Sequence, residues 1–409
     1  MWAFRGGNEM KTGHTPIPRY RPTTWPRLFT QGFRPFFLLA GLWAPAGLLL
    51  TLGVMFDVVA LPIDGAATIW HGHEMLFGFV AAAIAGFVLT AVPNWTGRLP
   101  LQGAPLALLV AFWLAGRIAM ALGGQLGAPA AGAIDMLFLL GLAAAVGREV
   151  VAGRNWRNLP VVGVLLVLVT TNALYHVQAA GWVELDDAPL RLGVATVAFL
   201  VSLIGGRVVP SFTRNALAKR GETKLPATTG PLDGAHLVAT ASAGLLWTVW
   251  PESMVTGTLL AVAAILGIIR LARWQGMRTL HEPLLWSLHL GYVWLPIAFA
   301  LLAASALGDA VPRSAGLHAL TAGAFGAMIL AVTSRATLGH TGRPLTAGPG
   351  LAACYILVAV AAALRVAAAV IGSTNELLLA GSAASWCAGF IAFLWVCGPM
   401  LIGQRPVKG

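Results

Sequence analysis

The hydrophobic positions of this chain fall in long runs that are separated by short polar segments. A run of about 20 apolar residues is long enough to cross a hydrocarbon core of about 30 Å as an α-helix. The short period-2 segments that are typical of transmembrane β-strands do not occur. Runs of the helical kind lie at 34–56, 69–93, 103–122, 130–147, 159–181, 189–210, 232–250, 254–272, 282–304, 314–337, 348–370 and 376–400. We therefore predict an all-α polytopic membrane protein with about twelve transmembrane helices.

The composition supports this class and the simplest domain organisation. Hydrophobic residues make up 58 % of the chain and charged residues 10 %, whereas soluble domains carry about 25 % charged residues. The N-terminal residues are polar and basic, which does not fit a cleavable signal peptide. We predict a basic cytoplasmic tail at 1–33, one membrane domain of twelve helices at 34–404, and a short cytoplasmic tail at 405–409.

The net charge of +11 raises nucleic-acid binding as a function, but its distribution argues against it. With the N-terminus inside, most lysine and arginine residues fall in the inner segments, where we also place Arg270, Arg273 and Arg278. The outer loops contain one cation, Arg313. This is the positive-inside pattern of a membrane protein whose two termini lie in the cytoplasm. The expected surroundings are therefore a lipid bilayer, not nucleic acid.

Three arginines depart from this pattern: Arg117, Arg191 and Arg365 lie within or at the edge of predicted spans, all toward the outer side. One interpretation is that their side chains extend to the outer surface. The alternative is that they meet fixed negative charge at that depth.

An internal repeat relates the second and tenth spans. Each opens with a histidine that is followed five residues later by glycine, and each closes with Thr-Gly-Arg. The matching residues are His73, Gly78 and Thr96-Gly97-Arg98 in the second span, and His318, Gly323 and Thr341-Gly342-Arg343 in the tenth. The sixth span ends in a similar way but has no histidine at its start. Spans that repeat every four helices predict three units of four helices around a pseudo-threefold axis.

Titratable residues gather at the predicted outer level. The stretch WHGHEMLFGF (70–79) contains His71, His73 and Glu74, and the topology places His318 and His176 at a similar depth. Polar groups inside a membrane are costly, so a shared depth indicates a functional site. His289 and His340 lie toward the inner side and are candidates for a second site. For the remaining histidines, such as His236 and His281, hydrogen-bonded helix packing is the preferred interpretation.

Histidine and arginine at one depth suit a non-covalently bound, b-type haem. Imidazoles ligate the iron, and guanidinium groups pair with the propionates; no C-x-x-C-H motif for covalent attachment occurs. On a regular helix, positions 71 and 73 are about 200° apart and cannot ligate the same metal. One assignment of roles places His73 on the haem iron, and it places His71 and Glu74 at a second metal or on a proton path. Glu74 would then act as a proton donor or acceptor.

These motifs resemble the NnrS family of bacterial membrane proteins. The resemblance rests on WHGHEMLFGF, GFVLTAVPNWTGR, NALYH, GGRVVPSFTRN, LHLGYVW and LHALTAGAFGAMILAVTSRATLGHTGRPL, with QGFRPFFLLA near the N-terminus. It implies a haem- and copper-containing protein of the cytoplasmic membrane that is linked to denitrification and nitric oxide stress. The family's histidine motifs fall on His71, His73, His176, His289, His318 and His340.

Three functions follow as hypotheses. The first is a haem-dependent enzyme that reduces nitric oxide to N2O, with electrons from an unidentified donor such as a quinol or a cytochrome. The second is a non-enzymatic haem or copper protein that senses nitric oxide or protects cellular iron. The third is a secondary transporter with histidine-based proton coupling, which would purify without visible colour.

Overall fold

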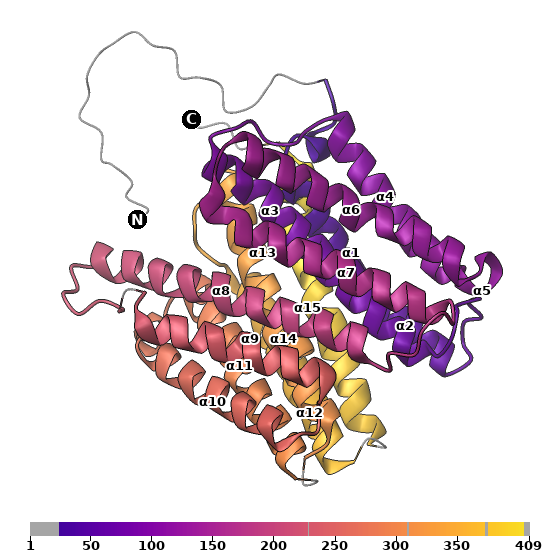
Figure 1. The fold of residues 1–409 in the computed structure, drawn as a ribbon. Coiled ribbons are helices and arrows are strands. Elements are labelled where there is room, and N and C mark those ends of the chain that lie inside the picture. The colour runs from indigo at the N-terminus through magenta and orange to yellow at the C-terminus, as the bar shows by residue number, and fades with distance from the viewer. Residues whose placement is uncertain (1–23, 228, 309–310, 373–374, 405–409) are drawn as a thin grey trace.

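The predicted all-α membrane fold is confirmed. The computed structural model describes residues 24–227, 229–308, 311–372 and 375–404 (Figure 1), and within them it contains helices and loops but no β-strand. Eleven helical segments of this described part are long and apolar enough to cross a membrane. The predicted tail at 405–409 and most of the tail at 1–33 lie outside the described residues.

The long helical segments of the described residues form three consecutive groups of four, of which all but α9 are apolar enough to cross a membrane. The first group contains α1 (Phe33–Met55), α2 (Ala67–His73) with η2 (Glu74–Val80) and α3 (Ala81–Thr96), α4 (Ala104–Ala121) and α6 (Ala128–Ala152). The second contains α7 (Leu159–Ala179), α8 (Ala188–Lys219), α9 (Pro231–Val249) and α10 (Met254–Ala272). The third contains α11 (Pro283–Leu307), α12 (Arg313–His318) with η5 (Ala319–Gly326) and α13 (Ala327–His340), α14 (Pro349–Ile371) and α15 (Glu376–Ile402). Short helices connect them: η1 (Arg27–Phe29), α5 (Gly123–Leu126), η3 (Trp156–Asn158) and η4 (Gly276–Thr279).

The second, sixth and tenth spans form the centre of the bundle. Of an apolar stretch of 18 residues in each span, 78 % are buried inside the protein in α2–η2–α3, 56 % in α8 and 67 % in α12–η5–α13, and these three spans contact one another. The last helix of each group packs against the first helix of the next, as α6 does on α7, α10 on α11 and α15 on α1. In Figure 1 the three groups follow one another from violet through red to yellow. This arrangement agrees with the pseudo-threefold repeat that the sequence predicts.

The repeated Thr-Gly-Arg motif ends a helix in both copies. Gly97 caps α3 with a φ of 71°, and Gly342 follows the end of α13 with a φ of 76°. Glycine adopts this left-handed conformation without the steric cost that a Cβ imposes. The repeat is therefore a structural stop signal as well as a mark of duplication.

The repeated histidines each end an α-helical turn and are followed by a π-helix. η2 begins directly after His73, and η5 begins directly after His318. A π-helix has a wider turn than an α-helix and is often found at functional sites. These segments depart from the regular α-helix that was predicted through both spans.

Two cations that we assigned to inner segments lie inside the bundle. Arg270 is 2 % exposed within α10, and its Nε donates to Asp233 Oδ1 of α9 at 2.6 Å. Arg34 in α1 is also buried and donates to the Leu401 carbonyl at 2.7 Å, near the C-terminus of α15. Arg270 lies in the last turn of α10, and it is a buried cation neutralised by a buried carboxylate instead of an exposed charge. Asp233 and His236 also make α9 more polar than the eleven apolar segments, although α9 packs between α8 and α10.

Candidate metal centre

His73 and Glu74 are adjacent in sequence, and both side chains point into the protein. Both are 0 % exposed, and His73 Nδ1 lies 3.1 Å from Glu74 Oε1. Neighbouring residues of an α-helix point about 100° apart. Here the change from α2 to the π-helix η2 occurs between the two residues, and they face the same buried cluster.

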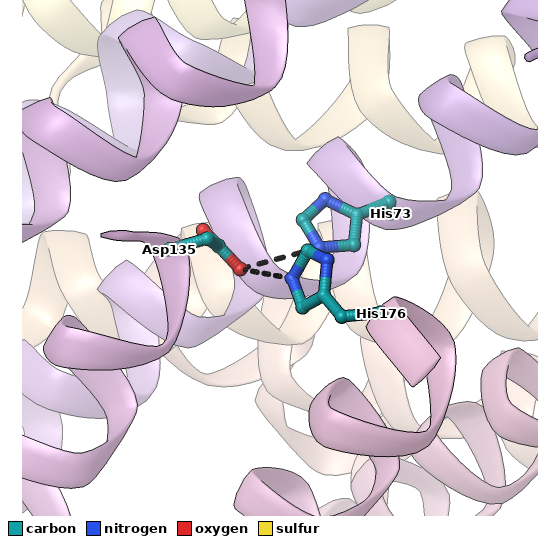
Figure 2. Close-up of side chains that lie close together, drawn as sticks. All are labelled: His73, Asp135 and His176. Atoms are coloured by element: carbon teal, nitrogen blue, oxygen red, sulfur yellow. Dashed lines mark hydrogen bonds and ion pairs between the residues drawn. The ribbon is translucent and has the colours of Figure 1, made fainter. Parts of the chain in front are cut away.

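The other face of the His73 imidazole meets side chains from α6 and α7. His73 Nε2 lies 3.0 Å from Asn172 Oδ1 and 3.3 Å from Asp135 Oδ2. His176, one helical turn after Asn172, places its Nε2 3.1 Å from the same Asp135 oxygen. Figure 2 shows both imidazoles directed at this carboxylate. Because three spans contribute, the cluster forms only when the first group packs against α7.

Arg117 of α4 joins the two buried carboxylates. Its NH1 donates to Glu74 Oε1 at 2.6 Å, and its NH2 donates to Asp135 Oδ1. The guanidinium is 4 % exposed, so all three charges are removed from water. Two carboxylates and one guanidinium leave one negative charge, which is costly in a buried site unless another cation is present. A bound metal ion or a proton on an imidazole would balance it.

A metal ion fits the donor atoms of this cluster. One ligand atom each from His73, Asp135 and His176 lies within 4.8 Å of the other two, and all three residues are buried. Two imidazoles and a carboxylate suit first-row metals such as iron, copper and zinc. The buried Glu74 Oε2 has no hydrogen-bond partner, so a further acceptor is available beside the three ligands. We call His73, Glu74, Arg117, Asp135 and His176 the His73 cluster.

A second group contains His71, His318 and Arg365. His71 Nδ1 lies 3.2 Å from Thr51 Oγ1, and His318 Nδ1 donates to the Ser314 carbonyl at 2.8 Å. That hydrogen bond fixes the His318 tautomer and leaves Nε2 as a lone-pair donor. The Arg365 charge acts on both imidazoles, and the two imidazoles interact with each other. The structure thus groups His71 with His318, while it groups His73 and Glu74 with Asp135 and His176.

The remaining predicted site residues lie elsewhere. Arg191 donates to the Thr248 carbonyl at 3.0 Å and lies near Asp187. His289 Nε2 lies 2.9 Å from Thr213 Oγ1, near the start of α11 and away from the His73 cluster. His340 ends α13, and its ring centre is 5.4 Å from that of Phe33.

The model of one protein family, described as NnrS protein, matches residues 27–405 of the chain. The chain belongs to the NnrS family. This membership confirms the resemblance and associates the chain with nitric oxide and with haem or metal binding in a membrane. A comparison with curated proteins finds no match.

Asp135 and Asn172 are the members of this NnrS site that the sequence analysis missed. Asp135 is the acidic residue of the predicted span 130–147, and a carboxylate inside a membrane span indicates a functional or paired group. Asn172 precedes His176 by four residues, the spacing of one helix face, which would have placed the two side chains together.

Proposed function

We propose that this NnrS-family protein binds haem and a second metal within the membrane and reduces nitric oxide to N2O. The observation that supports this most directly is the buried donor set of His73, Asp135 and His176 beside Glu74. The overall reaction joins two NO with two electrons and two protons to give N2O and water. A metal bound in the protein supplies an open coordination position and passes electrons to nitric oxide.

The chain's own residues have separable tasks in this proposal. His73, Asp135 and His176 would hold the second metal, iron or copper, and His71 and His318 would hold the haem iron. Glu74 is positioned to move a proton, since its Oε1 touches both His73 Nδ1 and Arg117 NH1 and its Oε2 has no partner. Arg117 fixes the positions of both carboxylates. The apolar surroundings keep bulk water from the reacting atoms.

One observation favours a non-enzymatic alternative. His73 and Glu74 are both 0 % exposed, and turnover requires protons to reach them. A protein that binds nitric oxide at a closed metal site, as a sensor or as a protector of cellular iron, does not have this requirement. The electron donor in the enzymatic case would be a quinol or a cytochrome, and the location is the cytoplasmic membrane.

The test begins with purified protein that contains its full complement of haem and metal. Visible spectra of the oxidised and reduced protein should show a haem, and element analysis should show a second metal. The reduced protein should consume nitric oxide, measured with an NO electrode, and release N2O, measured by gas chromatography. Nitric oxide that binds without being consumed would favour the non-enzymatic alternative, and a colourless protein would favour a transporter.

Glu74→Gln separates catalysis from metal binding. Glutamine retains the shape of the side chain and an acceptor for Arg117, but it does not ionise. Loss of a general acid–base group lowers turnover by about 10²- to 10⁴-fold, whereas the metal content and the NO-bound spectrum should be retained. His176→Ala should instead lose the second metal. Arg313→Gln, on an exposed arginine paired with Asp187, is the control and should match the wild type. Full turnover in Glu74→Gln would exclude Glu74 as the proton carrier.

A further inference from the structure

The two repeat copies place an arginine at the same position, in the helix that follows the histidine-containing span. Arg117 lies in α4, near its C-terminal end, and Arg365 occupies the matching place in α14. The residues that follow are also similar, with Ile-Ala-Met-Ala after Arg117 and Val-Ala-Ala-Ala after Arg365. The two arginines are therefore counterparts in the first and third groups.

Their surroundings differ in charge. Arg117 is neutralised by Glu74 and Asp135. In the third group, the residue that follows the repeated histidine is Ala319, where the first group has Glu74. The acidic position of Glu74 in the first copy thus corresponds to an alanine in the third.

Arg365 consequently lacks a carboxylate among the described residues. Its NH1 is buried without a hydrogen-bond partner, and no ion pair involves its guanidinium within the described part of the chain. An arginine that extends to the membrane surface would keep this atom in water. Arg365 as a whole is half-buried, but its NH1 is removed from water without a partner, which is costly for a charged group, so an external anion that reaches NH1 would bind favourably.

The neighbours of Arg365 indicate which anion this is. Its charge acts on His71 and on His318, and the His318 Nε2 is free to ligate a metal because Nδ1 donates to Ser314. A ligand that satisfies all three side chains must combine a metal with an anionic group. Haem has this combination, with an iron at its centre and carboxylates at its edge.

We propose that Arg365 pairs with a carboxylate of a haem held between α2, α12 and α14. After the duplication, Arg365 stayed free to bind an external anion, whereas Arg117 became part of the protein's own charge cluster. This inference rests on the proposed haem-binding function and assigns the haem's carboxylate to one arginine. Arg117 is excluded as its partner because its charge is already paired with Glu74 and Asp135 through NH1 and NH2, and only its Nε is left without a hydrogen bond.

The experiment compares two ligands that differ only at the carboxylates. Haem-free full-length protein in detergent is titrated with ferric haem and with ferric haem dimethyl ester, and binding is followed by the Soret absorbance. A charge-assisted hydrogen bond in a buried site corresponds to about a tenfold to hundredfold preference for haem over the ester. The wild-type protein should show this preference, and this comparison requires no variant.

Variants then locate the preference. Arg365→Gln should reduce haem affinity to that of the ester and leave ester affinity unchanged. Arg365→Lys should retain part of the preference, because it keeps the charge but not the planar fork of donors. Ala319→Glu should also weaken haem selectively, since it introduces the carboxylate that Glu74 provides in the first copy. Arg313→Gln is the control and should retain the full preference.

The outcomes separate this inference from the proposed function. Equal affinity of the wild-type protein for both ligands, or an unchanged preference in Arg365→Gln, would overturn the Arg365 assignment even if the protein still consumes nitric oxide. Failure of the wild-type protein to bind either haem would instead reject the proposed haem-binding function. Size-exclusion elution and helical circular dichroism of each variant check that it is folded.

Discussion

Arg117 stabilises a charge arrangement that would be unfavourable without it. Glu74 is 0 % exposed and Asp135 is 2 % exposed, and the same guanidinium contacts both. A buried carboxylate that loses its partner cannot regain the hydration it gave up on folding. At the residue scale, the stability of the His73 cluster therefore depends on this one cation.

Arg117→Met should destabilise the protein by about 3–5 kcal/mol, because it leaves two buried carboxylates without their guanidinium partner. Thermal unfolding in detergent measures the effect as a lower transition temperature. Arg117→Lys should fall between this variant and the wild type, since lysine keeps the charge but not the two parallel donors. The control is Arg313→Met, whose exposed pair with Asp187 is worth about 0–1 kcal/mol. Equal stability of Arg117→Met and the wild type would contradict the observed pairing.

The two π-helices are the elements that set the direction of the site histidines. In the first copy, η2 brings Gly78 so close to α1 and α4 that a Cβ on it would lie 2.5 Å from Trp43 Nε1 and 2.9 Å from Arg117 NH1. In the third copy, a Cβ on Gly323 would lie 2.6 Å from the Trp294 ring. Glycine is thus required at both repeated positions for the packing of a tryptophan-bearing helix, and this explains the histidine-to-glycine spacing seen in the sequence.

Gly78→Ala tests this packing and its link to the site. The added methyl group must displace the Trp43 ring or the Arg117 guanidinium, and overpacking of this kind costs about 1–3 kcal/mol. Because Arg117 holds Glu74 and Asp135, we also expect lower occupancy of the second metal, measured by element analysis after purification. Gly163→Ala is the matched control, since a Cβ on Gly163 meets no atom within 4 Å and alanine favours an exposed helix by about 1 kcal/mol. Similar losses in the two variants would show that the effect is not specific to the contact with Arg117.

At the scale of the whole molecule, the sequence predicts the spans well and their mutual contacts poorly. Apolar runs locate the helices to within a few residues, apart from the extension of α8 to Lys219, because the length of a span is fixed by the bilayer. The repeat predicts that the second, sixth and tenth spans are equivalent. Pairing across helices is different, since hydrophobicity does not specify which faces meet. The sequence predicts that His71 and His73 point apart, but the partners Asp135 and Asn172, and the grouping of Glu74 with His73, emerged only from the packed structure.

The orientation of the bundle is a whole-molecule prediction that the loop charges make. Trp182, between α7 and α8, is 68 % exposed and lies at the predicted outer end, close in sequence to His176. Thr223, in the loop after α8, is exposed at the predicted inner end. A membrane-impermeant maleimide should therefore label the Trp182→Cys variant in intact spheroplasts, and the Thr223→Cys variant only after permeabilisation. The parent protein is the control, because Cys354 and Cys397 are buried and Cys387 is half-buried. The opposite labelling pattern would invert the bundle, place the His73 cluster near the cytoplasmic surface, and require that protons for nitric oxide reduction enter from the cytoplasm.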